Sequence, residues 1–176
     1  MADWKTELAV AVLVKQALRA ADVHEIYPFS LPRVAATSDA VEGAERHLGR
    51  RLDGEYREFL LHADGWPHFF QRIDLFGTPE LRAEGSLLRA WELIDAAVPS
   101  PALHGLDKRD LMPIAFGQNS LDVFVLVNQG AQAGQVVWLA GEEVDSFPSF
   151  SEFFLAMIDY NRAELPHIQE ISKRPL

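Results

Sequence analysis

The amino-acid sequence predicts an α+β domain in which a mainly antiparallel sheet packs against helices, with an extra helix at the N-terminus. Two observations support this prediction. Helical periodicity is grouped in residues 3–63, and from residue 69 onward several short apolar or β-branched runs are separated by turn-forming residues. Runs of strands beside grouped helices are typical of α+β domains. The length of 176 residues suits one domain with a substantial core.

The composition excludes several kinds of site. The chain has no cysteine, which excludes disulfides, thiolate nucleophiles and cysteine-bound zinc. Its formal net charge is −10, with 26 acidic and 16 basic residues. A negative surface disfavours direct binding of nucleic acid and attracts a basic protein partner. The same acidity also suits a protein whose charge only maintains solubility.

The first predicted helix covers residues 3–21, which contain neither Gly nor Pro. Its apolar run Leu8–Val14 is far shorter than the ~20 residues that span a bilayer. Asp3 and Glu7 precede the run, where a signal peptide needs positive charge. We therefore expect a buried amphipathic helix in a cytoplasmic protein that does not contact membranes. A linker with Pro28 and Pro32 follows, so residues 1–37 form the predicted N-terminal helix and linker.

Two further helices are predicted before the first strand. The second starts near Ser38 or Asp39, where Asp39 can cap and Glu42 follows three residues on. Gly49 is the expected end of this helix. The third helix ends at residues 64–65, and an apolar stripe at helical spacing identifies it, formed by Tyr56, Phe59, Leu60 and Ala63.

The middle of the chain carries shorter signals. Its predicted elements are a strand at residues 69–76 ended by residues 78–79, a helix at 81–94, a loop at 99–110, and strands at 111–116, 121–127 and 135–139. Pro113 lacks a backbone N–H, so we expect an edge or a bulge at that position. Asp122 is the polar exception in the otherwise apolar run at 121–127.

The last helix has the clearest start. Ser149 and Glu152 have the spacing of a capping box. A broad apolar stripe follows, formed by Phe150, Phe153, Phe154, Met157 and Ile158. Pro166 is expected to end the helix. The main domain is therefore predicted to cover residues 38–165, and residues 166–176 are predicted to form a polar tail.

No pattern typical of catalysis occurs in the sequence. The six histidines never fall in a His-Glu-x-x-His arrangement, and neither a Gly-x-Ser-x-Gly elbow nor a phosphate-binding glycine loop is present. We therefore expect no catalytic residue, no metal and no cofactor. A carboxylate-based hydrolase is the least favoured alternative.

Five residues are candidates for contact with a partner. Glu142, Glu143 and Asp145 form an acidic group before the last helix, and Asp64 lies next to Gly65 and Trp66. Each acidic group is either a solvated face or an acidic binding patch. Trp66 suits an interface anchor, because Trp is enriched at binding hot spots, but we favour a core position for it.

Several motifs follow one another in order between Ser38 and Arg162, namely ERHLGRRL at 45–52, EYREFL at 55–60 followed by DG at 64–65, LMPIA at 111–115, the strand at 121–126 and SFSEFF at 149–154. In the order and spacing of these motifs the stretch resembles the SUKH superfamily, whose domain is also found in fungal cell-wall-synthesis regulators. The chain departs from the family in having Leu52-Asp53 in place of Leu-Pro, and Asp64-Gly65 in place of Asn-Gly. Asp preserves the turn chemistry of Asn.

The resemblance implies an α+β fold and a non-catalytic role. In bacteria, such domains often act as immunity proteins that bind and block secreted polymorphic toxins, many of them nucleases or deaminases. We therefore expect an immunity protein that occupies the active site of a basic toxin. The alternative is a regulatory or scaffold protein with a cellular protein partner, for which the N-terminal helix is the natural docking element.

Overall fold

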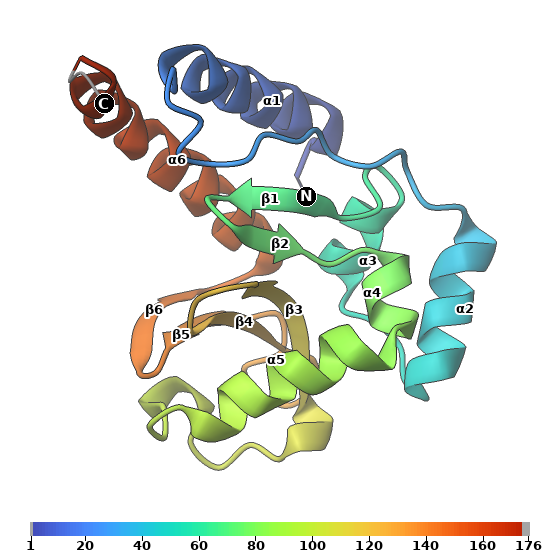
Figure 1. Cartoon of the computed structure of the whole chain (residues 1–176). Coiled ribbons are helices and arrows are strands. Elements are labelled where there is room, and N and C mark those ends of the chain that lie inside the picture. Colours follow the sequence, from blue (N-terminus) through green and yellow to red (C-terminus); the bar gives the residue numbers. More distant parts are fainter. Residues whose placement is uncertain (1, 174–176) are drawn as a thin grey trace.

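A computed structural model describes residues 2–173 as a six-stranded antiparallel sheet with helices packed on it (Figure 1). Each strand pairs with the next one in the chain, in the order β1 (Trp66–Phe70), β2 (Ile73–Leu75), β3 (Leu111–Gly117), β4 (Asp122–Val127), β5 (Val136–Ala140) and β6 (Glu143–Phe147). The helices are α1 (Trp4–Ala21), α2 (Ser38–Leu48), α3 (Gly54–Leu60), α4 (Thr78–Arg82), α5 (Glu84–Ala96) and α6 (Phe150–Ser172), with 3₁₀ turns η1 (Pro101–Leu103) and η2 (Lys108–Asp110). The predicted α+β class and the N-terminal helix are confirmed.

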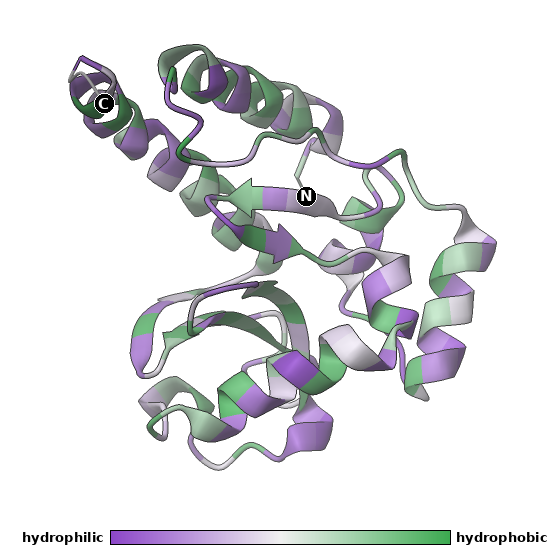
Figure 2. Ribbon diagram, in the orientation of Figure 1, coloured by the Kyte–Doolittle hydropathy of each residue, from purple (hydrophilic) through white to green (hydrophobic). Residues whose placement is uncertain are grey.

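The central strands are covered on both faces. Every residue from Val123 to Val127 is buried, and the ribbon of β3 and β4 is mostly hydrophobic in Figure 2. Phe124 meets Phe153 of α6 at 5.2 Å between ring centroids, so α6 covers one face. Helix α5 packs against β3 and β4 and accounts for the burial of the other face.

Helix α1 shares its core with the rest of the protein. The Trp4 ring lies 5.3 Å from Phe154 and 5.4 Å from Phe59, with both contacts edge-on, and it is 3% exposed. Edge-on contacts are a favoured geometry for aromatic pairs. The aromatic stripe of α6 is therefore completed by a residue from the start of the chain. The proposed boundary between residues 37 and 38 stays a prediction.

The helix starts follow local side-chain chemistry. Ser149 caps α6 as predicted, because its hydroxyl accepts a hydrogen bond from the Glu152 backbone N–H at 3.3 Å. The predicted cap of α2 was wrong. Thr37 is the N-cap residue, and its hydroxyl accepts a hydrogen bond from the Ala40 N–H at 3.2 Å. Asp39 lies in the first turn, where its negative charge interacts favourably with the helix dipole. Gly49 ends α2 with a left-handed φ of 67°, as expected.

The single strand predicted at residues 69–76 is a hairpin. Strands β1 and β2 pair antiparallel, with Phe70 opposite Ile73. Gln71 adopts a φ of 51°, which reverses the chain without any of the glycine or asparagine that normally marks such a turn. The missing turn signal explains why the sequence suggested continuous extended structure.

Two other predicted boundaries need correction. The helix predicted at 81–94 is split at Ala83 into α4 and α5. Pro79, which was expected to end a strand, lies in the first turn of α4. Glu80 stabilises this start, since its carboxylate accepts from the Gly77 N–H at 2.8 Å. Strand β6 was not predicted, because acidic residues such as Glu143 and Asp145 are uncommon in strands.

The prolines behave differently from one another. The bulge expected at Pro113 is confirmed, because the register of β3 and β4 shifts between Pro113 and Ala115. The helix end expected at Pro166 is wrong, since α6 continues to Ser172. Contacts with α1 stabilise the part of α6 after Pro166. Ile168 is buried there, and the Ser172 hydroxyl donates a hydrogen bond to the Ala21 carbonyl at 2.7 Å. Residues 174–176 of the predicted tail lie outside the described residues.

Candidate partner-binding surface

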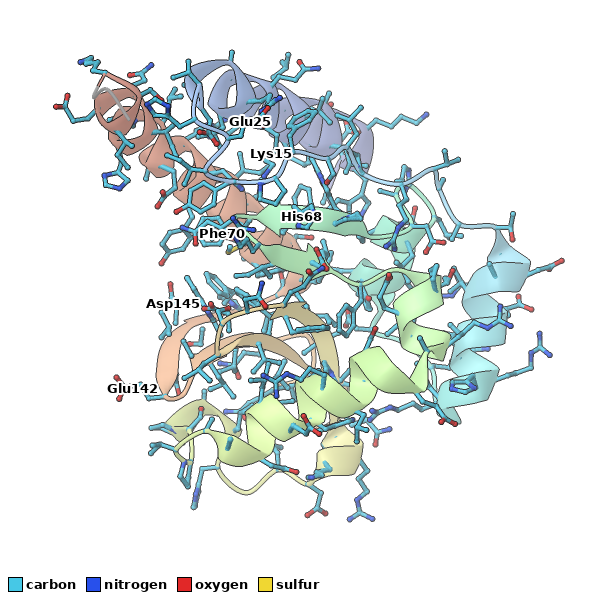
Figure 3. The ribbon with its side chains drawn as sticks, in the orientation of Figure 1. Lys15, Glu25, His68, Phe70, Glu142 and Asp145 are labelled. Atoms are coloured by element: carbon cyan, nitrogen blue, oxygen red, sulfur yellow. The ribbon has the colours of Figure 1, made fainter. Side chains whose placement is uncertain are left out.

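The five candidate residues fall in two separate places. Glu142 lies in the turn between β5 and β6, and Glu143 and Asp145 lie on β6. Asp64 and Trp66 lie at the junction of α3 and β1. Figure 3 labels Glu142 and Asp145 along the β5–β6 side of the molecule. The structure therefore keeps the first three together and separates them from the other two.

Trp66 occupies the core position that the sequence analysis favoured. Its side chain is fully buried, and its ring lies 5.5 Å from that of Phe69. The indole N–H donates to the Ser30 carbonyl at 3.1 Å, which satisfies its one polar group. Trp66 thus ties the linker to β1 and offers no surface to a partner in this conformation.

Asp64 has structural partners at both carboxylate oxygens. One oxygen accepts from the Thr78 backbone N–H at 2.5 Å, and the other accepts from the Thr78 hydroxyl at 2.8 Å. These bonds connect the end of α3 to the start of α4. The backbones approach so closely here that a Cβ atom added at Gly77 would lie 2.1 Å from the Asp64 carbonyl oxygen.

Glu143 is also engaged within the protein. Its carboxylate accepts hydrogen bonds from the Ser100 hydroxyl and, at 3.2 Å, from the Ala102 backbone N–H. The side chain is half-buried and connects β6 to the turn η1. Replacing Glu143 would therefore disturb this connection as well as any partner contact.

Asp145 belongs to a cluster of acids and aromatic rings. The Tyr160 hydroxyl donates to Asp145 at 3.1 Å, and the Trp138 indole N–H donates to Asp122 at 2.8 Å. The Trp138 and Tyr160 rings meet edge-on at 5.5 Å, and Phe70 contacts both rings. Burial, together with the hydrogen bond and charge of Asp145, raises the pKa of Tyr160.

Glu142 is exposed, and its carboxylate has no side-chain partner among residues 2–173. The neighbouring strand β6 is the last of the sheet. Within residues 2–173 it pairs only with β5, so its other edge carries no ladder hydrogen bonds to this part of the chain. We define the acidic edge as the surface formed by Asp122, Glu142, Glu143, Asp145 and Tyr160. An exposed carboxylate such as that of Glu142 can accept hydrogen bonds from Arg and Lys side chains.

Two of these residues were missing from the sequence-based candidates. Asp122 had a detectable signal, because it is the polar exception in an apolar strand. Tyr160 had none, because its contact with Asp145 depends on the path of α6 past the sheet.

In the part of the chain that the structure describes, no group of three or more His, Asp or Glu side chains is arranged to hold a metal ion. No described helix is long and apolar enough to cross a membrane. A cavity of about 30 Å³ lies between α1 and α6, and Lys15, Asp22 and Glu164 are among the residues that line it.

The chain matches a known family. Residues 35–156 match the family described as SMI1 / KNR4 family (SUKH-1), and this match covers more than half of the chain. The match includes the whole sheet and every residue of the acidic edge except Tyr160, and it leaves out α1. The resemblance to the SUKH superfamily is therefore confirmed. No curated protein matches the chain.

Proposed function

The chain belongs to the SMI1 / KNR4 family (SUKH-1), and on this premise we propose that it is an immunity protein that binds a secreted toxin and blocks its active site. SUKH domains occur in toxin-immunity proteins and in regulators, are generally non-enzymatic, and bind protein partners such as toxins. The toxin that we propose as the partner is basic, and a nuclease or a deaminase fits this description. The site of action is the cytoplasm.

The observation that carries this proposal is the acidic edge. A net charge of −10 accelerates the approach of a basic protein, and the exposed carboxylate of Glu142 pairs with an Arg or Lys side chain of that protein at the contact. Glu142 is the exposed, unpaired carboxylate of this surface. If the toxin is a nuclease, such carboxylates take the places of substrate phosphates in its active site.

The free edge of β6 supports the same proposal. Backbone N–H and C=O groups on an edge strand can pair with a strand of another protein. Val144 is 48% exposed beside this edge, so an apolar contact is also available. Backbone pairing would supply affinity, and the carboxylates would supply preference for a basic partner.

The first experiment is an affinity pull-down from the native source at low salt, with the bound proteins identified by mass spectrometry. We expect the full chain to capture a basic toxin domain that raised salt releases. Capture of cellular proteins unrelated to toxins would favour the regulatory alternative. The captured toxin is then tested for activity with and without the protein, since the proposal requires inhibition.

Charge reversal locates the contact. We expect Glu142→Lys to weaken toxin binding by ~10-fold and to reduce its salt dependence. Glu84→Lys makes the same change in net charge at the start of α5 and serves as the matched control. Equal affinity and equal salt dependence of the two variants would exclude Glu142 from the interface.

The regulatory or scaffold alternative is supported by a different observation. Apolar side chains are exposed along the N-terminal segment outside the family match, including Leu13, Leu31 and Val34, which is 90% exposed. Such exposed patches often mark protein contacts. Deleting residues 1–36 would remove Trp4 from the core, so the sharper test is Leu31→Ser with Val34→Ser. Loss of a non-toxin partner with unchanged stability would favour this alternative.

A further inference from the structure

A second surface, of opposite charge, lies between α2, α5 and η2. It consists of two adjoining hollows of about 720 Å³ and 550 Å³, which share Gly49 and Arg50. Six cationic side chains and four carboxylates line the two hollows together, and the cationic ones are Arg46, Arg50, Arg51, Arg57, Lys108 and Arg109. We call this surface the basic groove. Its excess of positive charge contrasts with the net charge of −10 of the whole chain.

Several of these cations lack an internal counter-ion. Arg46 and Arg51 make no ion pair within residues 2–173. The Arg50 guanidinium donates to the Arg109 backbone carbonyl at 2.5 Å, with no carboxylate in hydrogen-bond contact. Partial burial lowers the pKa of Arg50, and the charge of Asp110 offsets only part of this effect. An incoming carboxylate would therefore find three cations that no internal carboxylate neutralises, and one of them, Arg50, is already held in position by its hydrogen bond.

The groove also contains an apolar part. Leu88 and Trp91 lie three residues apart on α5, so they share one side of the helix. Leu88 is 63% exposed, and the Lys108 ammonium lies 5.4 Å from the centre of the Trp91 ring. Trp and Arg are among the residue types enriched at protein-binding hot spots. The combination suits a ligand that carries both negative charge and an apolar side chain.

We propose that the basic groove binds an acidic segment of a partner protein, with carboxylates on Arg46, Arg50 and Arg51 and an apolar side chain against Leu88 and Trp91. A protein segment fits better than a nucleic acid for two reasons. The exposed Leu88 offers an apolar contact that a phosphate backbone does not use, and the net charge of −10 repels a long polyphosphate. This inference does not depend on the acidic edge, because the two surfaces attract ligands of opposite charge.

The test is an NMR titration of the ¹⁵N-labelled full chain with a short synthetic peptide of glutamate, glycine and leucine. Trp91→Phe first assigns the Trp91 indole signal. We expect the Trp91 indole signal to shift until saturation as peptide is added, and the affinity to fall as salt rises. Replacing the glutamates of the peptide by glutamine, or its leucines by glycine, should weaken binding by at least ~10-fold.

Charge-reversal variants locate the site. Arg51→Glu, at an exposed position, should weaken binding of the peptide by ~10-fold, and Arg46→Glu should have a similar effect. Arg162→Glu makes the same change in net charge on α6 and should leave peptide affinity within ~2-fold of the unsubstituted chain. Unchanged signals elsewhere in each spectrum establish that the variant is folded.

Three outcomes would overturn the proposal. The first is equal weakening by Arg51→Glu and Arg162→Glu, which would reflect net charge alone. The second is tighter binding of a single-stranded oligonucleotide of the same charge, which would make the groove a nucleic-acid site. The third is a Trp91 shift that depends on protein concentration without peptide, which would assign the groove to a second copy of the chain.

Discussion

The ammonium group of Lys15 donates a hydrogen bond to the backbone carbonyl of His68 at 2.8 Å, and this bond joins α1 to β1 inside the protein (Figure 3). Lys15 is only 5% exposed. His68 has a φ of 53°, and its own N–H donates to the Asp74 carboxylate at 2.7 Å. A charged group is therefore buried where the N-terminal helix docks. Burial lowers the pKa of Lys15 to about 8.

This burial predicts an unusual pH dependence. Between pH values of about 8 and 10.5, the folded chain binds fewer protons at Lys15 than the unfolded chain does. The free energy of unfolding should therefore rise with pH in this range, by up to ~3 kcal/mol for this residue. Raised pKa values of Tyr27 and Tyr160 act in the opposite direction above pH 10.

Lys15→Met isolates the contribution of the lysine. Between about pH 7 and about pH 9.5, the free energy of unfolding of the unsubstituted chain should rise by ~2 kcal/mol relative to that of Lys15→Met. Urea denaturation at several pH values measures this difference. A difference that does not vary with pH would mean that the ammonium is solvated in the folded protein.

Trp4 should contribute strongly to stability although it lies outside the family match. Its ring contacts Phe59, Phe150 and Phe154. We expect Trp4→Ala to lower the free energy of unfolding by ~3–5 kcal/mol, because it leaves a cavity among these rings. Leu13→Ala on the exposed side of α1 is the control and should cost no more than ~0.5 kcal/mol. Similar small effects of both changes would contradict a large contribution of the Trp4 ring contacts to stability.

Asp64 and Glu142 should respond differently to loss of the carboxylate. Asp64→Ala leaves the Thr78 N–H and hydroxyl without their acceptor, which should cost ~1–3 kcal/mol. Glu142→Ala removes an exposed side chain and should change stability by less than ~0.5 kcal/mol. Thermal unfolding of the two variants makes the comparison. If Asp64→Ala changed stability as little as Glu142→Ala, the Asp64 carboxylate would have no structural role and would be available to a partner.

Gly77 should be intolerant of any side chain. Its added Cβ would meet the Asp64 backbone at 2.1 Å, so Gly77→Ala forces α4 away from the end of α3. We expect a loss of ~1–3 kcal/mol, measured by urea denaturation. Gly85 lies in α5 with no atom within 4 Å of an added Cβ. Gly85→Ala should therefore be neutral or stabilising by up to ~1 kcal/mol, and equal effects of both changes would contradict the close approach.

The sequence predicted most reliably the elements whose signals lie within a few residues. The Ser149 cap, the left-handed Gly49 and the bulge at Pro113 all follow from local backbone chemistry. Such signals failed where a turn used an uncommon residue, as at Gln71. They also failed at Pro166, where packing on α1 extends the helix beyond the position at which local preference would end it.

The sequence by itself determined the fold class, the family and the acidic character of the chain. Only the tertiary structure decided which acids are available to a partner. Asp64 is held by Thr78 and Glu143 by Ser100, whereas Glu142 stays unpaired among the described residues. The partners of the first two are distant in sequence, and a carboxylate gives the same local signal whether it is satisfied internally or exposed to solvent. Burial and hydrogen bonding between distant segments arise only when the helices and the sheet pack together.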